Sequence, residues 1–307
     1  MKNLVIVLLN IFVLHAHAGI VSTNDPHLGL KDSLPKTDEI RVYSKHYDDY
    51  FAWKDSSDVA KAIAVKKYRP KLNYSDMEPI EVRTATVIKV PASALTKEKL
   101  ATLDAVKRLF NSSLEGNRFD HINTDPSQAG SITGEDYKAG FVAGTSSMGQ
   151  DSFVTTTVSF SPVVAAAVQN LRHKYEPVLK IYSRIYYYSK TEIEGDAKRK
   201  ANAQKLSPTG QLPSGVLYQN LWLFNQFFGT GALQYHFYDL GDGRTLIVTY
   251  CYFGALRHVM EGGVAPYTGR EVLTGRRELS QIGLVGKGIP SLVAVIVQNT
   301  ALELAKY

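Results

Sequence analysis

The chain has 307 residues, of which 44% are hydrophobic, and a formal net charge of +6. This length is enough for one large domain or two small domains with a sizeable core. The positive charge is mild and dispersed, so it favours contact with anionic surfaces and predicts no nucleic-acid partner. Cys251 is the only cysteine, which excludes an intramolecular disulfide.

Residues 1–18 have the three parts of a secretory signal peptide. Lys2 supplies the positive charge, residues 4–14 are apolar except for Asn10, and Ala16-His17-Ala18 matches an A-x-A cleavage site. The apolar stretch is shorter than the ~20 residues that span a bilayer. We therefore expect cleavage near Ala18 and export of the remaining chain, either to the periplasm or out of the cell.

Residues 19–150 predict an N-terminal extension or a small α+β region. Residues 19–50 are polar and lack a clear period, which predicts an extended arm. Three elements are expected to follow: a short helix over 57–67, a strand over 81–90 and a helix over 96–110. Residues 111–150 are rich in Gly, Ser, Thr, Asn and Asp and predict a long irregular region.

Residues 151–307 have a sharper pattern, which predicts one antiparallel domain. The expected elements are a strand over 153–160, a helix from Ser161-Pro162 to about Pro177, strands over 179–194, 216–228, 232–240 and 245–256, and a further strand around 270–279. Gly229-Thr230-Gly231 and Gly241-Asp242-Gly243 predict tight connections. Pro290 opens an apolar helix that continues to about Ala305, and a helix this apolar should be clasped by other elements.

The order of these elements resembles the helix-grip fold of the START-like superfamily of lipid-binding and polyketide-cyclase proteins. The matching pieces are Thr155–Pro162 leading into the first helix, the two glycine turns, and Gly288-Ile289-Pro290 before the last helix. The resemblance covers about half the chain, and the segment 180–195 departs from it by supplying strands where the family has a helical turn. The resemblance implies a curved antiparallel sheet wrapped around the C-terminal helix, with a cavity for an apolar ligand between them. The preceding 130 residues of the exported chain have no counterpart in a minimal family member, so the expected fold class is α+β and helix-grip-like, with an N-terminal α/β extension.

Both faces of the expected strands mix aromatic and polar side chains, as the walls of ligand cavities do. Alternation places Leu233, Tyr235 and Phe237 on one face and Gln234, His236 and Tyr238 on the other. The candidate ligand-binding residues are Tyr186, Tyr188, Tyr218, Asn220, Trp222, Phe224, Tyr235, His236, Phe237, Tyr250, Tyr252 and Arg257. Among them Asn220, His236 and Arg257 are expected to orient a polar end of the ligand. A sheet with one helix-covered face and one aromatic surface explains the same pattern.

No catalytic, cofactor or metal motif stands out. The exported chain has no His-x-His or His-x-x-x-His pair and no Cys cluster, so no zinc site is predicted. Asp239 and Asp242 lack the spacing of a calcium loop. Ser146-Ser147 lacks the G-x-S-x-G context of a hydrolase nucleophile. We therefore expect a ligand-binding protein, with no catalytic residues, rather than an enzyme.

Two other functions fit the same sequence features. The tyrosine-rich sheet could serve an interaction or adhesion protein of the cell envelope, or the chain could be an exported hydrolase that uses His121 or His236. The basic run Lys198-Arg199-Lys200 lies between Gly195 and Pro208 and predicts a loop. That loop is either solvated or directed at an anionic membrane surface.

Overall fold

The computed structural model describes residues 19–63, 73–100, 119–125, 152–160, 178–223, 228–264, 267–275 and 288–307, with single residues at 105, 108, 109 and 112. In these ranges a mostly antiparallel sheet has the order β1-β2-β3-β9-β8-β7-β6-β5-β4. Its strands are β1 Gly19–Ser22, β2 Glu39–His46, β3 Met77–Ile88, β4 Phe119–Asp125, β5 Ser152–Phe160, β6 Val178–Ser189, β7 Gly215–Leu223, β8 Phe228–Asp239 and β9 Thr245–Leu256. β10 Gly263–Val264 and β11 Tyr267–Thr268 form a separate pair.

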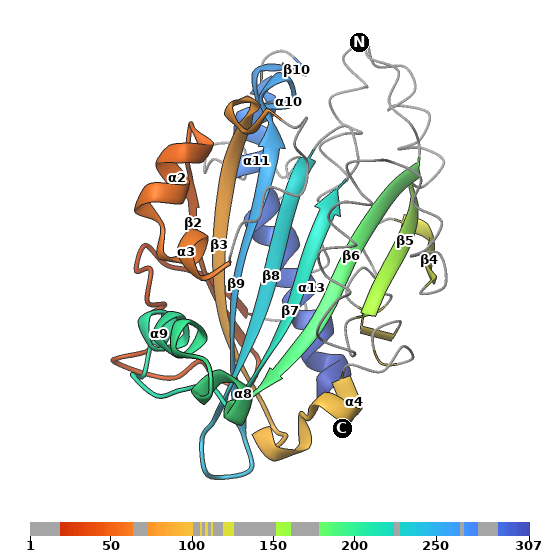
Figure 1. Ribbon diagram of the computed structural model, residues 1–307. Coiled ribbons are helices and arrows are strands. Elements are labelled where there is room, and N and C mark those ends of the chain that lie inside the picture. Colours follow the sequence, from red (N-terminus) through yellow and green to blue (C-terminus); the bar gives the residue numbers. More distant parts are fainter. Residues whose placement is uncertain are drawn as a thin grey trace.

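The described helices lie on both faces and at the ends of this sheet (Figure 1). They are α2 Tyr50–Ser56, α3 Asp58–Ala62, α4 Lys97–Leu100, α8 Lys190–Glu194, α9 Ala197–Leu206, α10 Arg257–Glu261, α11 Gly269–Thr274 and α13 Gly288–Leu304, with 3-10 turns η1 Tyr74–Asp76 and η2 Ala92–Ala94. The predicted α+β class is therefore confirmed.

The C-terminal helix α13 is clasped by the sheet, as its composition predicts. It passes behind the strands in Figure 1 and comes closest to β2 and β3. Its apolar residues, among them Val293 and Val297, share one core with Val82 and Ile247 of the sheet. Burying such a helix against a sheet removes a large apolar area from water. This is the helix-grip arrangement. Within the described residues, no helix is both long and apolar enough to cross a membrane.

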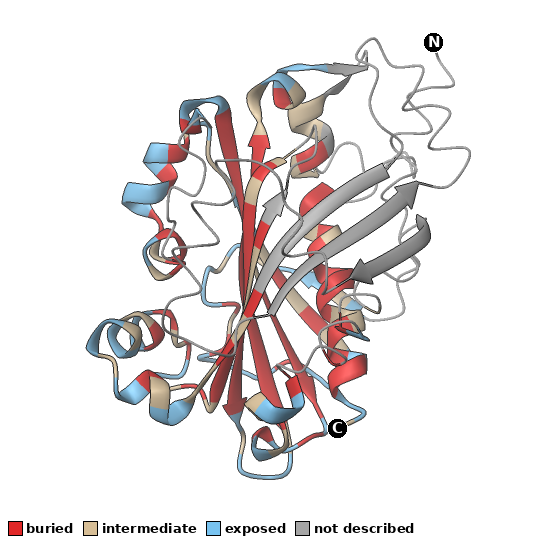
Figure 2. Ribbon diagram, turned by 45° about the vertical axis from the view of Figure 1, so that its right-hand side comes forward, coloured by how far each residue is buried: buried red, intermediate tan, exposed pale blue. Residues whose placement is uncertain are grey.

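The face of the sheet that points away from α13, the outer face, is also covered. There Trp53 of α2, Val59 of α3 and Leu206 of α9 share a second core with Val248 and Tyr252. Figure 2 shows buried residues concentrated in the central strands and α13, and exposed residues on the solvent sides of α2 and α9. The central strands are therefore buried on both faces.

The N-terminal region contributes strands to this same sheet. β1 pairs with β2 in parallel, β2 pairs with β3, and β3 pairs with β9 along its whole length. The prediction of an extended arm over 19–50 is therefore wrong for β1 and β2. The reason is visible in β2, where Ile40 and Val42 alternate with more exposed residues and face the α13 core. The division of the chain near residue 150 stays a prediction.

Three other predicted elements need correction. Gly229-Thr230-Gly231 is no turn but lies inside β8, at a bulge where Gly231 brings the backbone close to the Tyr252 carbonyl. The strand expected to reach Glu194 ends at Ser189, because Ser189 and Glu192 form a capping box that starts α8. Residues 269–274 form α11 rather than a strand.

The basic run is also not a loop. Lys198, Arg199 and Lys200 lie on α9, which begins because the Asp196 carboxylate accepts a hydrogen bond from the Arg199 backbone N–H. Its buried residues Ala203 and Leu206 hold it on the sheet.

The turn at Gly241-Asp242-Gly243 is confirmed. Both glycines have positive φ, which a two-strand connection of this kind requires. Within the region expected to be irregular, β4 forms an edge strand beside β5. The helix expected from Ser161 to Pro177 falls outside the described residues, as does most of the predicted helix over 96–110, of which α4 is the start.

Candidate functional site

The structure divides the predicted ligand-binding residues between the two faces of the sheet. Tyr235 and Phe237 belong to the α13 core. The residues on the outer face are Tyr186, Tyr188, Tyr218, Asn220, His236, Tyr250 and Tyr252. These two sets cannot line one cavity, because the sheet lies between them. Whether either set binds a ligand stays a prediction.

Three predicted residues remain. Arg257 begins α10, where its guanidinium donates to the backbone carbonyls of Asp48 and Ser75. It therefore lies at an end of the strands. In β7 the backbone of Trp222 pairs with Tyr182 of β6. Phe224 lies outside the described residues.

A row of hydroxyl groups crosses the α13 side of the sheet. Thr84 of β3 pairs with Thr249 of β9, which pairs with Tyr235 of β8. Tyr235 forms a side-chain hydrogen bond with Thr300 of α13, and its complete burial raises the pKa of its phenol. Thus polar groups from three strands and the helix meet inside an otherwise apolar layer.

Two of these hydroxyls have no hydrogen-bond partner in the described part of the chain. The Oγ1 atoms of Thr84 and Thr249 are both fully buried and unpaired. Nearby threonines on the same strands differ: Thr86 donates to the Glu39 carbonyl at 3.1 Å, and Thr245 donates to the Val90 carbonyl at 2.6 Å. An unpaired buried hydroxyl costs about 1–3 kcal/mol. Two such hydroxyls side by side therefore need a physical explanation, and they mark this layer as a candidate ligand site.

Sequence reasoning missed Thr84, Thr249 and Thr300. A signal was present, because Thr84 continues the alternation of Ile80 and Val82 and so had to share their buried face. The pairing of β3 with β9, which brings Thr84 beside Thr249, could not be read from the sequence.

The outer face carries a second polar group of residues around His236. Its Nε2 lies 3.0 Å from Oε1 of Gln234, and its ring lies edge-on to Tyr250, with ring centroids 5.0 Å apart. Burial lowers the pKa of His236 to about 3, so the imidazole is neutral at pH 7. Among the described residues, no hydrogen bond joins its ring to a carboxylate.

Tyrosines cluster beside this group on β6 and β7. The rings of Tyr186 and Tyr218 stack with centroids 4.8 Å apart, and Tyr188 meets Tyr218 edge-on. The Arg199 guanidinium lies 4.0 Å from the centroid of the Tyr188 ring, a cation–π contact. Asn220 donates to the Tyr186 hydroxyl at 3.3 Å. Four of the predicted site residues are therefore in mutual contact here.

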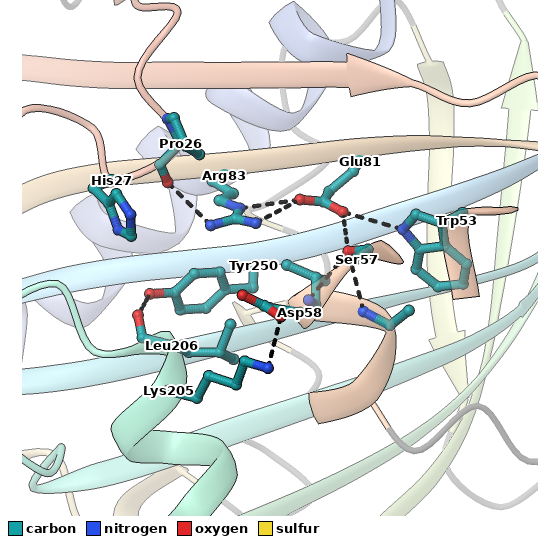
Figure 3. A network of polar contacts seen from close by, with 12 residues as sticks. Pro26, His27, Trp53, Ser57, Asp58, Glu81, Arg83, Lys205, Leu206 and Tyr250 are labelled. Carbon is teal, nitrogen blue, oxygen red and sulfur yellow. Dashed lines mark hydrogen bonds and ion pairs between the residues drawn. The ribbon is translucent and has the colours of Figure 1, made fainter. Parts of the chain in front are cut away.

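A buried carboxylate anchors the outer layer to the sheet (Figure 3). Glu81 accepts hydrogen bonds from Trp53 Nε1, Ser57 Oγ and the Arg83 guanidinium. Arg83 also donates to the Pro26 carbonyl, so one ion pair connects the N-terminal segment, α2 and α3 to β3. Trp53, Ser57 and Arg83 all direct hydrogen-bond donors at this carboxylate, so we assign the network a structural role.

A second buried carboxylate lies at the start of β3, three residues before Glu81. Glu78 is fully buried and accepts from Arg270 of α11 at 2.6 and 2.9 Å and from His46 at 2.8 Å. Burial alone would raise its pKa, but the hydrogen bonds from Arg270 and His46 lower it. Oxygen and nitrogen atoms of His46, Asp48 and Glu78 lie close enough for a metal ion. The guanidinium already occupies both carboxylate oxygens and adds positive charge, so this group does not fit a cation.

No family model and no curated protein matches the chain. The chain is similar to the aromatase/cyclase Zhui from Streptomyces sp. R1128, with 11% identity, a TM-score of 0.31, and coverage of 72% of this chain and 93% of that one. It is also similar to Ara h 8.0201, with 10% identity, a TM-score of 0.29, and coverage of 72% of this chain and 97% of that one. For norcoclaurine synthase from Thalictrum flavum the identity is 8% and the TM-score 0.30, with coverage of 73% of this chain and 87% of that one.

Identities this low say nothing of what this chain binds. The expected resemblance to START-like helix-grip proteins is confirmed as a fold, by the sheet wrapped on α13.

Proposed function

We propose that this protein binds a hydrophobic or lipid-like molecule between the sheet and α13. The observation that supports this most directly is the pair of buried hydroxyls of Thr84 and Thr249, which have no partner among the described residues and lie in the apolar layer beneath the helix. Ligand sites combine apolar walls with a few polar groups that orient the ligand. The ligand therefore carries one polar group, such as a carbonyl or hydroxyl, beside an apolar body.

The first experiment is mass spectrometry of solvent extracts from the mature protein, purified from its native host without detergent. A stoichiometric apolar molecule with one polar group supports the proposal and identifies the ligand class. An empty extract from well-folded protein contradicts it and favours the alternative of a cell-envelope interaction protein. Extracts of a T84V/T249V variant give the matched comparison, because this variant keeps the apolar walls and loses only the hydroxyls.

Export is part of the proposal and rests on residues 1–18 alone. Mass spectrometry of the protein recovered from the periplasm and from the medium identifies the residue with which the chain begins. A chain that starts at Gly19 supports cleavage after Ala18. A chain that keeps residues 1–18 in both fractions contradicts it.

An anionic membrane surface is a further proposed partner, through α9. Lys198 and Lys200 are exposed there, and the Arg199 side chain is held against Tyr188. Sedimentation with vesicles of anionic phospholipid, compared with neutral vesicles, tests this. Binding that a K198Q/K200Q variant loses supports the surface, and equal binding to both vesicle types contradicts it.

A further inference from the structure

The polar group on the outer face has hydrogen-bonding capacity that the described chain does not use. Gln234 and His236 are both 1% exposed. Within the described ranges, neither Gln234 Nε2 nor His236 Nδ1 has a partner. Both atoms lie on the face away from α13, so the ligand proposed above does not reach them.

The chemistry of the pair defines what is missing. Because Gln234 Oε1 accepts from His236, the imidazole carries its proton on Nε2 and leaves Nδ1 as a bare acceptor. Gln234 Nε2 is a donor. If the oxygen and nitrogen of the Gln234 amide are interchanged, the Gln234 nitrogen donates to His236 Nε2. The Gln234 oxygen is then the free acceptor and His236 Nδ1–H the free donor. The pair therefore offers one donor and one acceptor in either arrangement.

The surroundings favour a neutral occupant. Burial is the cause of the low pKa of His236, with no contribution from a charged group. Arg83, on the same row of the sheet, is held by Glu81 and lies 5.9 Å from the centroid of the Tyr250 ring. An ion at Gln234 would pay a large desolvation cost without a counter-charge.

The row to which Gln234 belongs extends towards the surface. Gln234 pairs with Tyr218, which pairs with Tyr186, and the two stacked rings are only half-buried. On its other side Gln234 pairs with Tyr250. Aromatic rings thus flank the amide on both sides, and planar molecules pack well against such rings.

We propose that the outer face holds a second binding site, at Gln234 and His236, for a small neutral aromatic molecule that carries a hydroxyl or carboxamide group. The polar group of the ligand accepts from one member of the pair and donates to the other. The ring of the ligand lies against the stacked rings of Tyr186 and Tyr218, and the ligand enters from that side.

The test uses three probes of similar size: phenol, benzamide and toluene. Each is titrated into the ¹⁵N-labelled mature protein, and the ring nitrogens of His236 are followed by long-range ¹H–¹⁵N NMR, with assignment from a H236F variant. Phenol or benzamide is expected to shift the unpaired ring nitrogen, and whichever binds more tightly identifies the polar group. Toluene should leave it unchanged.

Two variants give the controls. Q234M keeps the size of the side chain and is expected to lower the affinity of the protein for the polar probe by about tenfold. T84V/T249V changes the other face and should leave probe affinity unchanged. The proposal is overturned if neither polar probe shifts the His236 nitrogens at millimolar concentration, or if toluene binds as well as they do. Because the NMR measurement uses the wild-type protein, it remains decisive even if Q234M fails to fold.

Discussion

Thr84 lies directly opposite Thr249 across β3 and β9, and both side chains are on the α13 side of the sheet. Each strand also carries a threonine whose hydroxyl donates to a backbone carbonyl, Thr86 and Thr245. The sheet therefore contains two kinds of buried threonine in the same strands. The difference allows the proposed ligand contact to be separated from ordinary structural hydrogen bonds.

The first prediction concerns the stability of the ligand-free protein. Replacing Thr84 and Thr249 by Val removes two unpaired buried hydroxyls, so T84V/T249V should raise the free energy of unfolding by about 1–2 kcal/mol. The control T86V/T245V breaks two satisfied bonds and should lower it by a similar amount. Urea unfolding followed by tryptophan fluorescence measures both. Destabilisation of T84V/T249V as large as that of the control would show that the two hydroxyls are already paired.

The second prediction concerns pH. His236 has a pKa of about 3 in the folded protein, against about 6.5 in an unfolded chain. Between these values the unfolded chain binds a proton that the folded protein does not, so stability falls as pH decreases below about 6.5. From pH 7 to pH 5 the loss due to this group is about 2 kcal/mol.

The comparison of wild type with H236F isolates this effect, because the carboxylates contribute equally to both proteins. Urea unfolding at pH 7 and pH 5 should show a smaller pH dependence for H236F, by about 2 kcal/mol. Equal pH dependence in the two proteins would mean that His236 titrates near its usual value and is accessible to water.

The third prediction concerns the ion pair between Glu78 and Arg270. R270M leaves a buried carboxylate without its main partner and should cost about 2 kcal/mol, less than for two fully buried ions because Arg270 is partly exposed. The double variant E78Q/R270M, which leaves no charge to bury, should recover part of this loss. K97M, which breaks the more exposed pair with Glu192, should change stability by less than about 0.5 kcal/mol.

Thermal unfolding measures all three variants. The lowered pKa of Glu78 means that its stabilisation is present at neutral pH and is lost as pH falls, so the cost of R270M should shrink in acid. A cost for R270M no larger than that for K97M would show that Glu78 finds another partner.

Local sequence patterns predicted the elements whose cause is local. The strand 245–256 and the turn Gly241–Gly243 follow from alternation and from residues that adopt positive φ. The C-terminal helix follows from its apolar composition. The faces of Tyr235 and His236 in β8 also follow from alternation alone.

Features that depend on distant parts of the chain could not be predicted this way. The pairing of β3 with β9 brings Thr84 to Thr249 over a long separation in sequence, and the Glu78–Arg270 ion pair brings α11 to β3. The outer layer was only partly predicted. A helix was expected at α3, but α2 and α9 were missed because short helices gain their stability from packing rather than from their own sequence. The candidate list therefore mixed residues of both faces.

The last prediction uses Cys251, which lies two residues from Thr249 on the same strand and belongs to the α13 core. Its complete burial raises the pKa of the thiol well above the usual range, so the reactive thiolate is scarce and shielded. A thiol reagent such as Ellman's reagent should therefore label the folded protein only as fast as the core opens. A molecule bound between the sheet and α13 stabilises the closed state and should slow labelling further, by the same factor as it raises the equilibrium constant for folding. Since the chain has one cysteine, the signal belongs to this position alone. Rapid labelling of native protein would contradict the packed core, and labelling unaffected by a ligand recovered from the native host would place that ligand outside the α13 layer.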